Sequence, residues 1–257
     1  MGSITSPSPG HALETSGGGG WLLISDVDDT LTGDDAALRE LVGAVARRRP
    51  RLTFALNSSR PAASVDRTLA EVFPTGFTPD AVITAMGTQM RIGGAWDDAW
   101  TARFADWPRD EVFDVVSSLG FRGHDAEYQT PHKASFAVPA GEAQAEVLRE
   151  LDKRGLPVRA IASGADDLDL LPPSGGKDHA TLYLAERLGF HETQRWAVAG
   201  DSANDLAMFR VAPHAIAVGN ARAELLDAMP RDTAWHADEP HAAGVHAGLR
   251  RLGVWVD

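Results

Sequence analysis

Apolar residues along this chain gather into short runs that alternate with longer segments of helical spacing. The first run, residues 21–24, has no polar break, which favours a strand buried on both faces, as in a parallel sheet. Residues 36–49 place apolar side chains at helical intervals and end in an arginine run, where cations suit the helix dipole. Pro50 stops this helix, and residues 52–56 form a second apolar run. The alternation predicts an α/β fold with a parallel sheet.

The same alternation of strands and helices resumes after a central stretch in which the predicted elements follow a different order. Further strands are predicted at 80–84, 168–171, 195–200 and 215–218, and helices at 179–188 and at the end of the chain. Residues 106–165 instead read as helix, strand, helix, strand, at 111–119, 132–139, 142–154 and 156–162. We therefore predict a core formed by residues 21–105 and 166–257, with a smaller α/β domain inserted at 106–165.

Composition narrows the possible partners. The 257 residues are 44% hydrophobic and 23% charged, which is ordinary for a globular protein. The formal net charge of -12 disfavours nucleic acid and anionic membranes, although a small anionic substrate responds to local charge instead. Cysteine is absent, which excludes disulfides and thiolate metal sites and fits a cytoplasmic location. No apolar run approaches the roughly 18 residues of a membrane helix, and we expect a monomer or weak dimer.

Residues 1–20 form a segment rich in glycine, serine and proline. They lack the charged start and the long apolar middle of a signal peptide. We interpret them as a flexible leader that carries no chemistry.

Carboxylates follow two of the predicted strands directly. Asp26, Asp28 and Asp29 come after the first strand, and Asp201 and Asp205 come after the strand at 195–200. Open α/β sheets place their sites at this edge. Such a cluster repels itself unless a cation neutralises it, and Mg²⁺ prefers carboxylate oxygens. Taken alone, the first group also fits an acidic surface turn, and the second fits the start of a helix.

Two other residues suit a phosphate. Ser58 follows the strand at 52–56, where a hydroxyl and a helix N-terminus can bind phosphate oxygens, although the same hydroxyl fits an N-cap. Lys177 follows Gly175 and Gly176 just before a predicted helix. Taken alone, that Gly-Gly-Lys stretch fits a solvated loop.

These stretches resemble, in the correct order, the motifs of the haloacid dehalogenase (HAD) superfamily of phosphatases. DVDDT at 26–30 is similar to the first motif, DxDxT, and GDSAND at 200–205 to the fourth, while Ser58 and Lys177 match the second and third. VITAMGT at 82–88, the tryptophan-rich segment after it and DLDLLP at 167–172 resemble the sucrose-phosphate phosphatase group. The resemblance implies a Rossmann-like HAD core with a parallel sheet and an inserted α/β cap that covers the site.

The resemblance also implies a function and a set of site residues. The function is a Mg²⁺-dependent phosphomonoester hydrolase for a sugar phosphate, with sucrose 6-phosphate the first candidate. Asp26 would be the nucleophile that forms an aspartyl-phosphate, and Asp28 the general acid and base. Ser58 and Lys177 would hold the phosphoryl oxygens. Asp26, Asp201 and the Asp28 carbonyl would bind Mg²⁺ with support from Asp205, and substrate contacts are expected at Ser59, Arg60, Asn204 and Lys133.

Several positions leave alternatives open. Ser59 stands where the relatives usually have glycine, and Ala165 where they commonly have lysine. Trp96, Trp100 and Trp107 could line a sugar site or pack a domain joint, and the joint is favoured. Lys133 and Arg159 could contact a sugar or a phosphate, but exposure to solvent is favoured.

Other functions also remain. The substrate could be another phosphorylated glycoside, of the trehalose, mannosyl-phosphoglycerate or pseudo-disaccharide type. A phosphomutase shares the motifs but returns the phosphoryl group to a sugar. A catalytically silent binding protein would be expected to have lost Asp26 or Asp28, and this chain keeps both.

Overall fold

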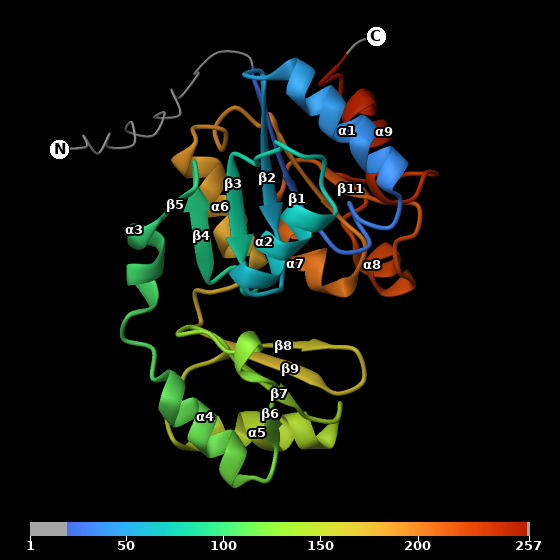
Figure 1. Ribbon diagram of the computed structural model, residues 1–257. Helices are drawn as coiled ribbons and strands as arrows, with labels where there is room; N and C mark the ends of the chain where they lie inside the picture. Colours follow the sequence, from blue (N-terminus) through green and yellow to red (C-terminus); the bar gives the residue numbers. More distant parts are fainter. Residues whose placement is uncertain (1–19, 256–257) are drawn as a thin grey trace, which may run out of the picture.

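The computed structural model describes residues 20–255, and its larger part is built on one sheet of eight strands (Figure 1). The strand order is β12-β11-β10-β1-β2-β3-β4-β5. Neighbours from β12 to β3 are parallel, and β4 and β5 continue the sheet as antiparallel strands. The strands are β1 (Trp21–Ser25), β2 (Leu52–Asn57), β3 (Ala81–Thr84), β4 (Gln89–Ile92), β5 (Ala95–Trp96), β10 (Trp196–Gly200), β11 (Ala215–Ala217) and β12 (Ala234–His236). The leader expected at 1–20 lies, except for Gly20, outside the described residues.

Helices cover both faces of this sheet. Successive residues of β1 point to opposite faces, so that Leu23 joins one apolar cluster while Leu22 and Ile24 join the other. This confirms the prediction of a strand buried on both sides. The first face is covered by α1 (Asp35–Arg48), α2 (Ala62–Glu71) and α9 (His241–Arg251), and the second by α3 (Asp98–Thr101), α6 (Lys177–Arg187), α7 (Leu206–Val211) and α8 (Ala223–Ala228). Among residues 20–255, no helix combines the length and the apolar character needed to cross a membrane.

A second, antiparallel sheet lies beyond the edge where the parallel strands end (Figure 1). Its order is β6-β7-β9-β8, and it carries its own apolar core. The elements are α4 (Arg109–Ser118), β6 (Arg122–Gly123), β7 (Ala134–Ala137), α5 (Glu142–Lys153), β8 (Arg159–Ser163) and β9 (Asp167–Leu171). We call residues 109–171 the cap.

The position of β9 corrects one prediction. From the sequence, the chain was expected to return to the core after residue 165 and to form a core strand at 168–171. Instead β9 pairs with β7 on one side and β8 on the other. Leu168 and Leu170 pack with Phe136 and Val147 in the cap cluster. The alternation of aspartate and leucine predicts a strand but does not identify the sheet that it joins, and the chain returns to the core only after Leu171.

Tryptophans pack on either side of the connection between core and cap. Trp100 is fully buried in the core, 4.8 Å from the Tyr183 ring, and its Nε1 donates to the Gly87 carbonyl at 3.1 Å. Trp107 belongs to the cap cluster. Both therefore have a packing role, each in the apolar core of one domain beside the connection. Trp96 has no such role, because it is 51% exposed on the edge strand β5.

Candidate active site

Neighbouring strands of the core sheet place several polar groups at one edge. β1 lies between β2 and β10, and the three strands run parallel, so their carboxyl ends meet. Asp26 follows β1, Asn57 ends β2, and Asp201 follows β10. All three side chains are buried. The convergence predicted from the strand ends is therefore present in the structure.

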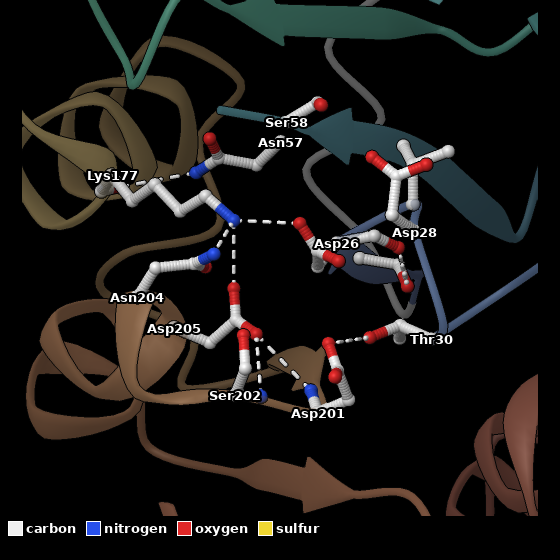
Figure 2. A network of polar contacts seen from close by, with 12 residues as sticks. Asp26, Asp28, Thr30, Asn57, Ser58, Lys177, Asp201, Ser202, Asn204 and Asp205 are labelled. Atoms are coloured by element: carbon white, nitrogen blue, oxygen red, sulfur yellow. Dashed lines mark hydrogen bonds and ion pairs between the residues drawn. The ribbon is translucent and has the colours of Figure 1, made fainter. Parts of the chain in front are cut away.

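The ammonium of Lys177 lies at the centre of this group (Figure 2). Lys177 Nζ donates to Asp26 Oδ1 at 2.6 Å, to Asp205 Oδ1 at 2.7 Å and to Asn204 Oδ1 at 2.9 Å. Asn57 Nδ2 donates to the Lys177 carbonyl at 3.1 Å and so helps to fix the first residue of α6. Burial opposes the charge on Lys177, but the Asp205 and Asp26 carboxylates outweigh it and raise the pKa of this lysine above its usual value. Lys177 is therefore a fixed cation.

Asp205 organises the turn that follows β10. Its Oδ1 accepts from Lys177, and its Oδ2 accepts the backbone N–H groups of Asp201 at 3.1 Å and Ser202 at 3.2 Å. Thr30 Oγ1 donates to Asp201 Oδ1 at 3.2 Å. Because both oxygens of Asp205 are engaged in this way, Asp205 supports the site and leaves the Asp26 and Asp201 carboxylates to face a ligand.

The charge of this cluster favours a divalent cation. One oxygen from each of Asp26, Asp201 and Asp205 lies within 4.8 Å of the others. Burial and the neighbouring Asp205 raise the pKa of Asp26 well above its usual range, against the opposing effect of Lys177, and they raise the pKa of Asp201 to about 6. One ammonium does not balance three buried carboxylates, and a cation held by hard oxygen ligands would favour the charged forms of Asp26 and Asp201. The donor set fits Mg²⁺.

The loop after β1 presents Asp28 beside this cluster. Asp28 Oδ1 lies 2.7 Å from Arg60 Nη2 in a partly exposed ion pair. Burial raises the pKa of Asp28, although Arg60 opposes the shift. Asp29 adopts a left-handed conformation with φ of 56°, and its carbonyl accepts from Asn220 Nδ2 and bonds His241 Nδ1, both at 2.8 Å. Two distant segments thus hold the backbone beside Asp28.

Two cavities open where the core meets the cap. The first, of about 630 Å³, is lined by core residues that include Asp26, Asp28 and Asn204, and by cap residues 162–165. The second, of about 380 Å³, is lined by Arg60 from the core and mainly by polar residues of the cap: His124, Tyr128, Lys133, Ser135, Ser163, Asp167 and Asp169. Ser59 and Ser163 line both cavities. The carboxylates therefore face a space that extends under the cap.

Ser58 directly follows β2, as predicted, and its hydroxyl is held inside the protein. It is fully buried and lines neither of these cavities, and its Oγ accepts from the Arg60 backbone N–H at 3.1 Å. Its own N–H donates to the Ile83 carbonyl, so pairing with β3 continues through Ser58 and holds it inside. Ser59, one residue further on, lines both cavities. The role of Ser58 at a phosphoryl oxygen stays a prediction, and Ser59 is a second hydroxyl residue beside the ligand space.

The cap cations make protein contacts, which contradicts the favoured reading that they face solvent. Lys133 is buried, and its Nζ lies 3.1 Å from Asp169 Oδ2 and 3.5 Å from the Ser59 carbonyl. Lys133 lines the second cavity, so it remains a candidate for substrate contact. Arg159 is partly buried and pairs with Asp178 at 2.7 Å.

Three residues near the carboxylates were given no role from the sequence. Thr30 lies inside the DxDxT pattern, and Asn57 lies at a strand end, so both positions carried a usable signal. Arg222 lies 3.7 Å from Asp29 Oδ2 and 3.9 Å from Asp201 Oδ2, and it lines the first cavity. Nothing in its local sequence indicates that position, which results from the turn after β11.

A parallel core sheet, an inserted antiparallel cap and acidic strand ends between them define a HAD-superfamily protein with an α/β cap, as predicted. A HAD subclass IIB sugar phosphatase shares this fold, with a TM-score of 0.65 at 15% identity. A family model described as sucrose-6F-phosphate phosphohydrolase matches residues 20–253. The chain belongs to this family, which confirms the resemblance.

Two groups of relatives support this assignment. The sucrose-phosphatase structure from Synechocystis sp. PCC6803, in complex with sucrose and phosphate, gives a TM-score of 0.81 at 29% identity, covering 90% of this chain and 97% of that one. Sucrose-phosphatase 1 of Nicotiana tabacum is 35% identical over 183 residues, or 65% of this chain. Probable sucrose-phosphatase 2 of Arabidopsis thaliana is 36% identical over 189 residues, or 68% of this chain. The matched region is 43% of each plant protein, so the chain spans less than half the length of these curated relatives.

Proposed function

We propose that this chain is a Mg²⁺-dependent phosphomonoester hydrolase that acts on a sugar phosphate. The observation that carries the proposal is the buried Asp26–Lys177–Asp205 group, which faces a cavity shared by core and cap. A carboxylate held by a fixed cation beside such a cavity suits nucleophilic attack on phosphorus. Membership of the sucrose-6F-phosphate phosphohydrolase family supports the same chemistry.

The reaction proceeds in two steps. Asp26 attacks phosphorus, the bond from phosphorus to the sugar oxygen breaks, and Asp28 donates a proton to that oxygen. In the second step Asp28 takes a proton from water, the water oxygen bonds phosphorus, and the bond to Asp26 breaks to release phosphate. Burial raises the pKa of Asp28, and an upward shift favours a group that donates a proton in the first step and accepts one in the second.

The remaining groups orient the phosphoryl group and balance its charge. Lys177 holds Asp26 in place and offers positive charge to the phosphoryl oxygens. Ser59 and Asn204 line the cavity and offer a hydroxyl and an amide. Asp26, Asp201 and the Asp28 carbonyl would hold Mg²⁺, which when bound would neutralise charge on the transferring group. Asp205 would keep Lys177 and the Asp201 backbone in position.

We further propose that the sugar is a disaccharide, with sucrose 6-phosphate the first candidate. The second cavity adds about 380 Å³ of space beside Ser59, lined by polar residues, which offers room for a group beyond a single hexose. The Synechocystis relative was solved with sucrose and phosphate. Contacts remote from phosphorus can help to close the cap over the substrate.

Phosphate release by the purified full chain with Mg²⁺ tests these proposals. The substrates are sucrose 6-phosphate, trehalose 6-phosphate, glucose 6-phosphate and a mannosyl phosphoglycerate, compared by kcat/KM. We expect sucrose 6-phosphate to be preferred. A clear preference for glucose 6-phosphate would reject the disaccharide and leave the hydrolase standing, whereas transfer to a second sugar without free phosphate would identify a mutase.

A further inference from the structure

We propose that Arg159 is a positioning residue that fixes the segment leading into Lys177 against the cap. Arg159 thereby acts on the reaction through Lys177 and not by contact with the substrate. This inference rests on the proposed function. Arg159 begins β8 and pairs in register with Leu171, the last residue of β9. The chain then crosses back to the core and reaches Lys177, the first residue of α6.

The guanidinium of Arg159 bonds residues on both sides of Lys177. Its Nη1 donates to the Gly175 carbonyl at 2.8 Å and to Asp178 Oδ1 at 2.7 Å, while its Nη2 donates to Asp178 Oδ2 at 3.0 Å. The pair is bidentate, and the two side chains are 23% and 16% exposed. Planar, partly buried pairs of this kind restrict geometry as well as adding energy. A residue of the cap strand β8 therefore fixes the backbone on both sides of Lys177.

The segment has little room to shift. Gly176 has a φ of +124°, and a Cβ there would collide with Arg159 Nη1. On the opposite side, a Cβ at Gly87 would collide with the Gly176 carbonyl. The crossing segment is thus packed between the cap guanidinium and the turn after β3. A change at Arg159 is therefore expected to shift the position of Lys177.

The first connection from core to cap, which passes through Trp107, is bonded to the same part of the cap as the second connection, which leads to Lys177. Trp107 precedes α4, and its Nε1 donates to the Pro157 carbonyl at 2.9 Å. Pro157 lies two residues before Arg159. Both connections between core and cap therefore meet at residues 157–159, and the orientation of the cap is coupled to the position of Lys177.

Direct binding of substrate by Arg159 is the competing role. Arg159 is absent from the residues that line the two cavities beside the carboxylates. Its charge is paired with Asp178, which is also absent from both linings. Asp178 distinguishes the two roles, because it contacts Arg159 but has no place in a substrate site.

The test compares Arg159→Ala, Asp178→Asn and the double variant, with sucrose 6-phosphate and with p-nitrophenyl phosphate. We expect each single variant to lower kcat by about 10- to 100-fold on both substrates, because a misplacement near 1 Å can cost 100-fold. KM should change little, and the double variant should match Arg159→Ala, since Arg159→Ala already removes the pair with Asp178 together with the bond to Gly175. Arg154→Ala is the matched control, because Arg154 is an exposed cap arginine whose side chain pairs with Glu150 within the described residues 20–255. It should behave as wild type.

Three kinetic results would overturn the proposal. These are a raised KM in Arg159→Ala without a change in Asp178→Asn, additive losses in the double variant, and wild-type kcat in both single variants. Arg159→Lys keeps the charge but cannot form the fork, so it should restore kcat only in part. Urea unfolding of each variant separates a loss of folded protein from a loss of turnover.

Hydrogen exchange tests the contact between Arg159 and the segment around Lys177 independently of enzyme activity. Amides of residues 174–180 should exchange about tenfold faster in Arg159→Ala and Asp178→Asn than in wild type or Arg154→Ala, because a charge-assisted contact of this kind is lost. Unchanged exchange would overturn the proposal even if kcat falls. A wild-type protein inactive on every phosphomonoester would instead reject the proposed function, and exchange alone would then decide whether Arg159 holds the segment.

Discussion

The core side and the cap side of the site are built in different ways. On the core side, Lys177, Asp201 and Asp205 are 4% exposed or less, and they bond one another or the same turn. On the cap side, the Lys133–Asp169 pair is buried, but His124 Nε2 and Asp167 Oδ1, 2.9 Å apart, belong to side chains that are 30% and 53% exposed, and Tyr128 is 42% exposed. The core side resembles a preorganised reaction centre. The cap side resembles a hydrated recognition surface.

This difference determines how large an effect on turnover we expect from a substitution on each side. Within the core network, each group depends on several others, so one change alters charge balance and geometry together. On the exposed part of the cap face, around His124, Tyr128 and Asp167, side chains have few partners and water can replace a lost one. Substitutions on the core side should therefore lower turnover steeply, while those on the cap side should alter the choice of substrate.

Asp26→Asn should have the largest effect. It removes the attacking charge while Lys177 keeps its contacts with Asp205 and Asn204. We expect turnover to fall by about 10⁴-fold or more, as for loss of other catalytic nucleophiles. The free energy of unfolding should be unchanged or higher, because burial already disfavours the charged form of Asp26. Turnover within tenfold of wild type would reject the role of Asp26 and with it the contrast between the two sides.

Metal removal should be nearly as severe. EDTA should abolish turnover and Mg²⁺ should restore it, whereas Ca²⁺ should fail or inhibit because it accepts looser and higher coordination. Mg²⁺ should also raise the thermal unfolding midpoint, since a ligand that binds only the folded state stabilises it. Asp201→Asn should abolish that shift, which gives a readout independent of activity. Full activity in a chelated sample would contradict the proposed site.

The sequence predicted the core side better than the cap side for a physical reason. Parallel strands end at one edge, so polar residues that follow apolar runs are brought together whatever the details of their loops. Asp26 and Asp201 converge on this basis, whereas Lys177 reaches the site as the first residue of α6. Whether Ser58 or Ser59 faces the ligand space depends on how far pairing with β3 continues, and no local pattern records that length.

The cap side depends on contacts between distant segments. Leu168 and Leu170 alternate with aspartates and predict a strand, but its partners β7 and β8 are known only once the cap is assembled. Arg159 looked like an exposed cation because its partner Asp178 lies across the joint. Pairings of this kind arise from tertiary packing, which single-sequence patterns do not encode.

Substitutions on the cap face should have smaller and more selective effects. Tyr128→Ala should raise KM for sucrose 6-phosphate by about three- to tenfold, because one lost contact amounts to about 1 kcal/mol. KM for p-nitrophenyl phosphate should not change, since that molecule is too small to occupy both cavities. Leu148→Ala is the control, because Leu148 is exposed on α5 outside both linings. Equal effects on both substrates would show that Tyr128 does not contact the sugar.

The smallest effect is expected at the joint, and it should appear in stability before activity. Trp107→Phe keeps an aromatic ring in the cap cluster but removes the donor to the Pro157 carbonyl. We expect a loss of about 1 kcal/mol in the free energy of unfolding, measured in urea, because a partly buried hydrogen bond is removed. Trp96→Phe is the matched control, since Trp96 is 51% exposed and its replacement should stay within about 0.5 kcal/mol of wild type. Because Arg159 still fastens the other crossing segment, kcat should fall less in Trp107→Phe than in Arg159→Ala. The reverse order would show that the position of Lys177 depends more on the connection through Trp107 than on the one held by Arg159.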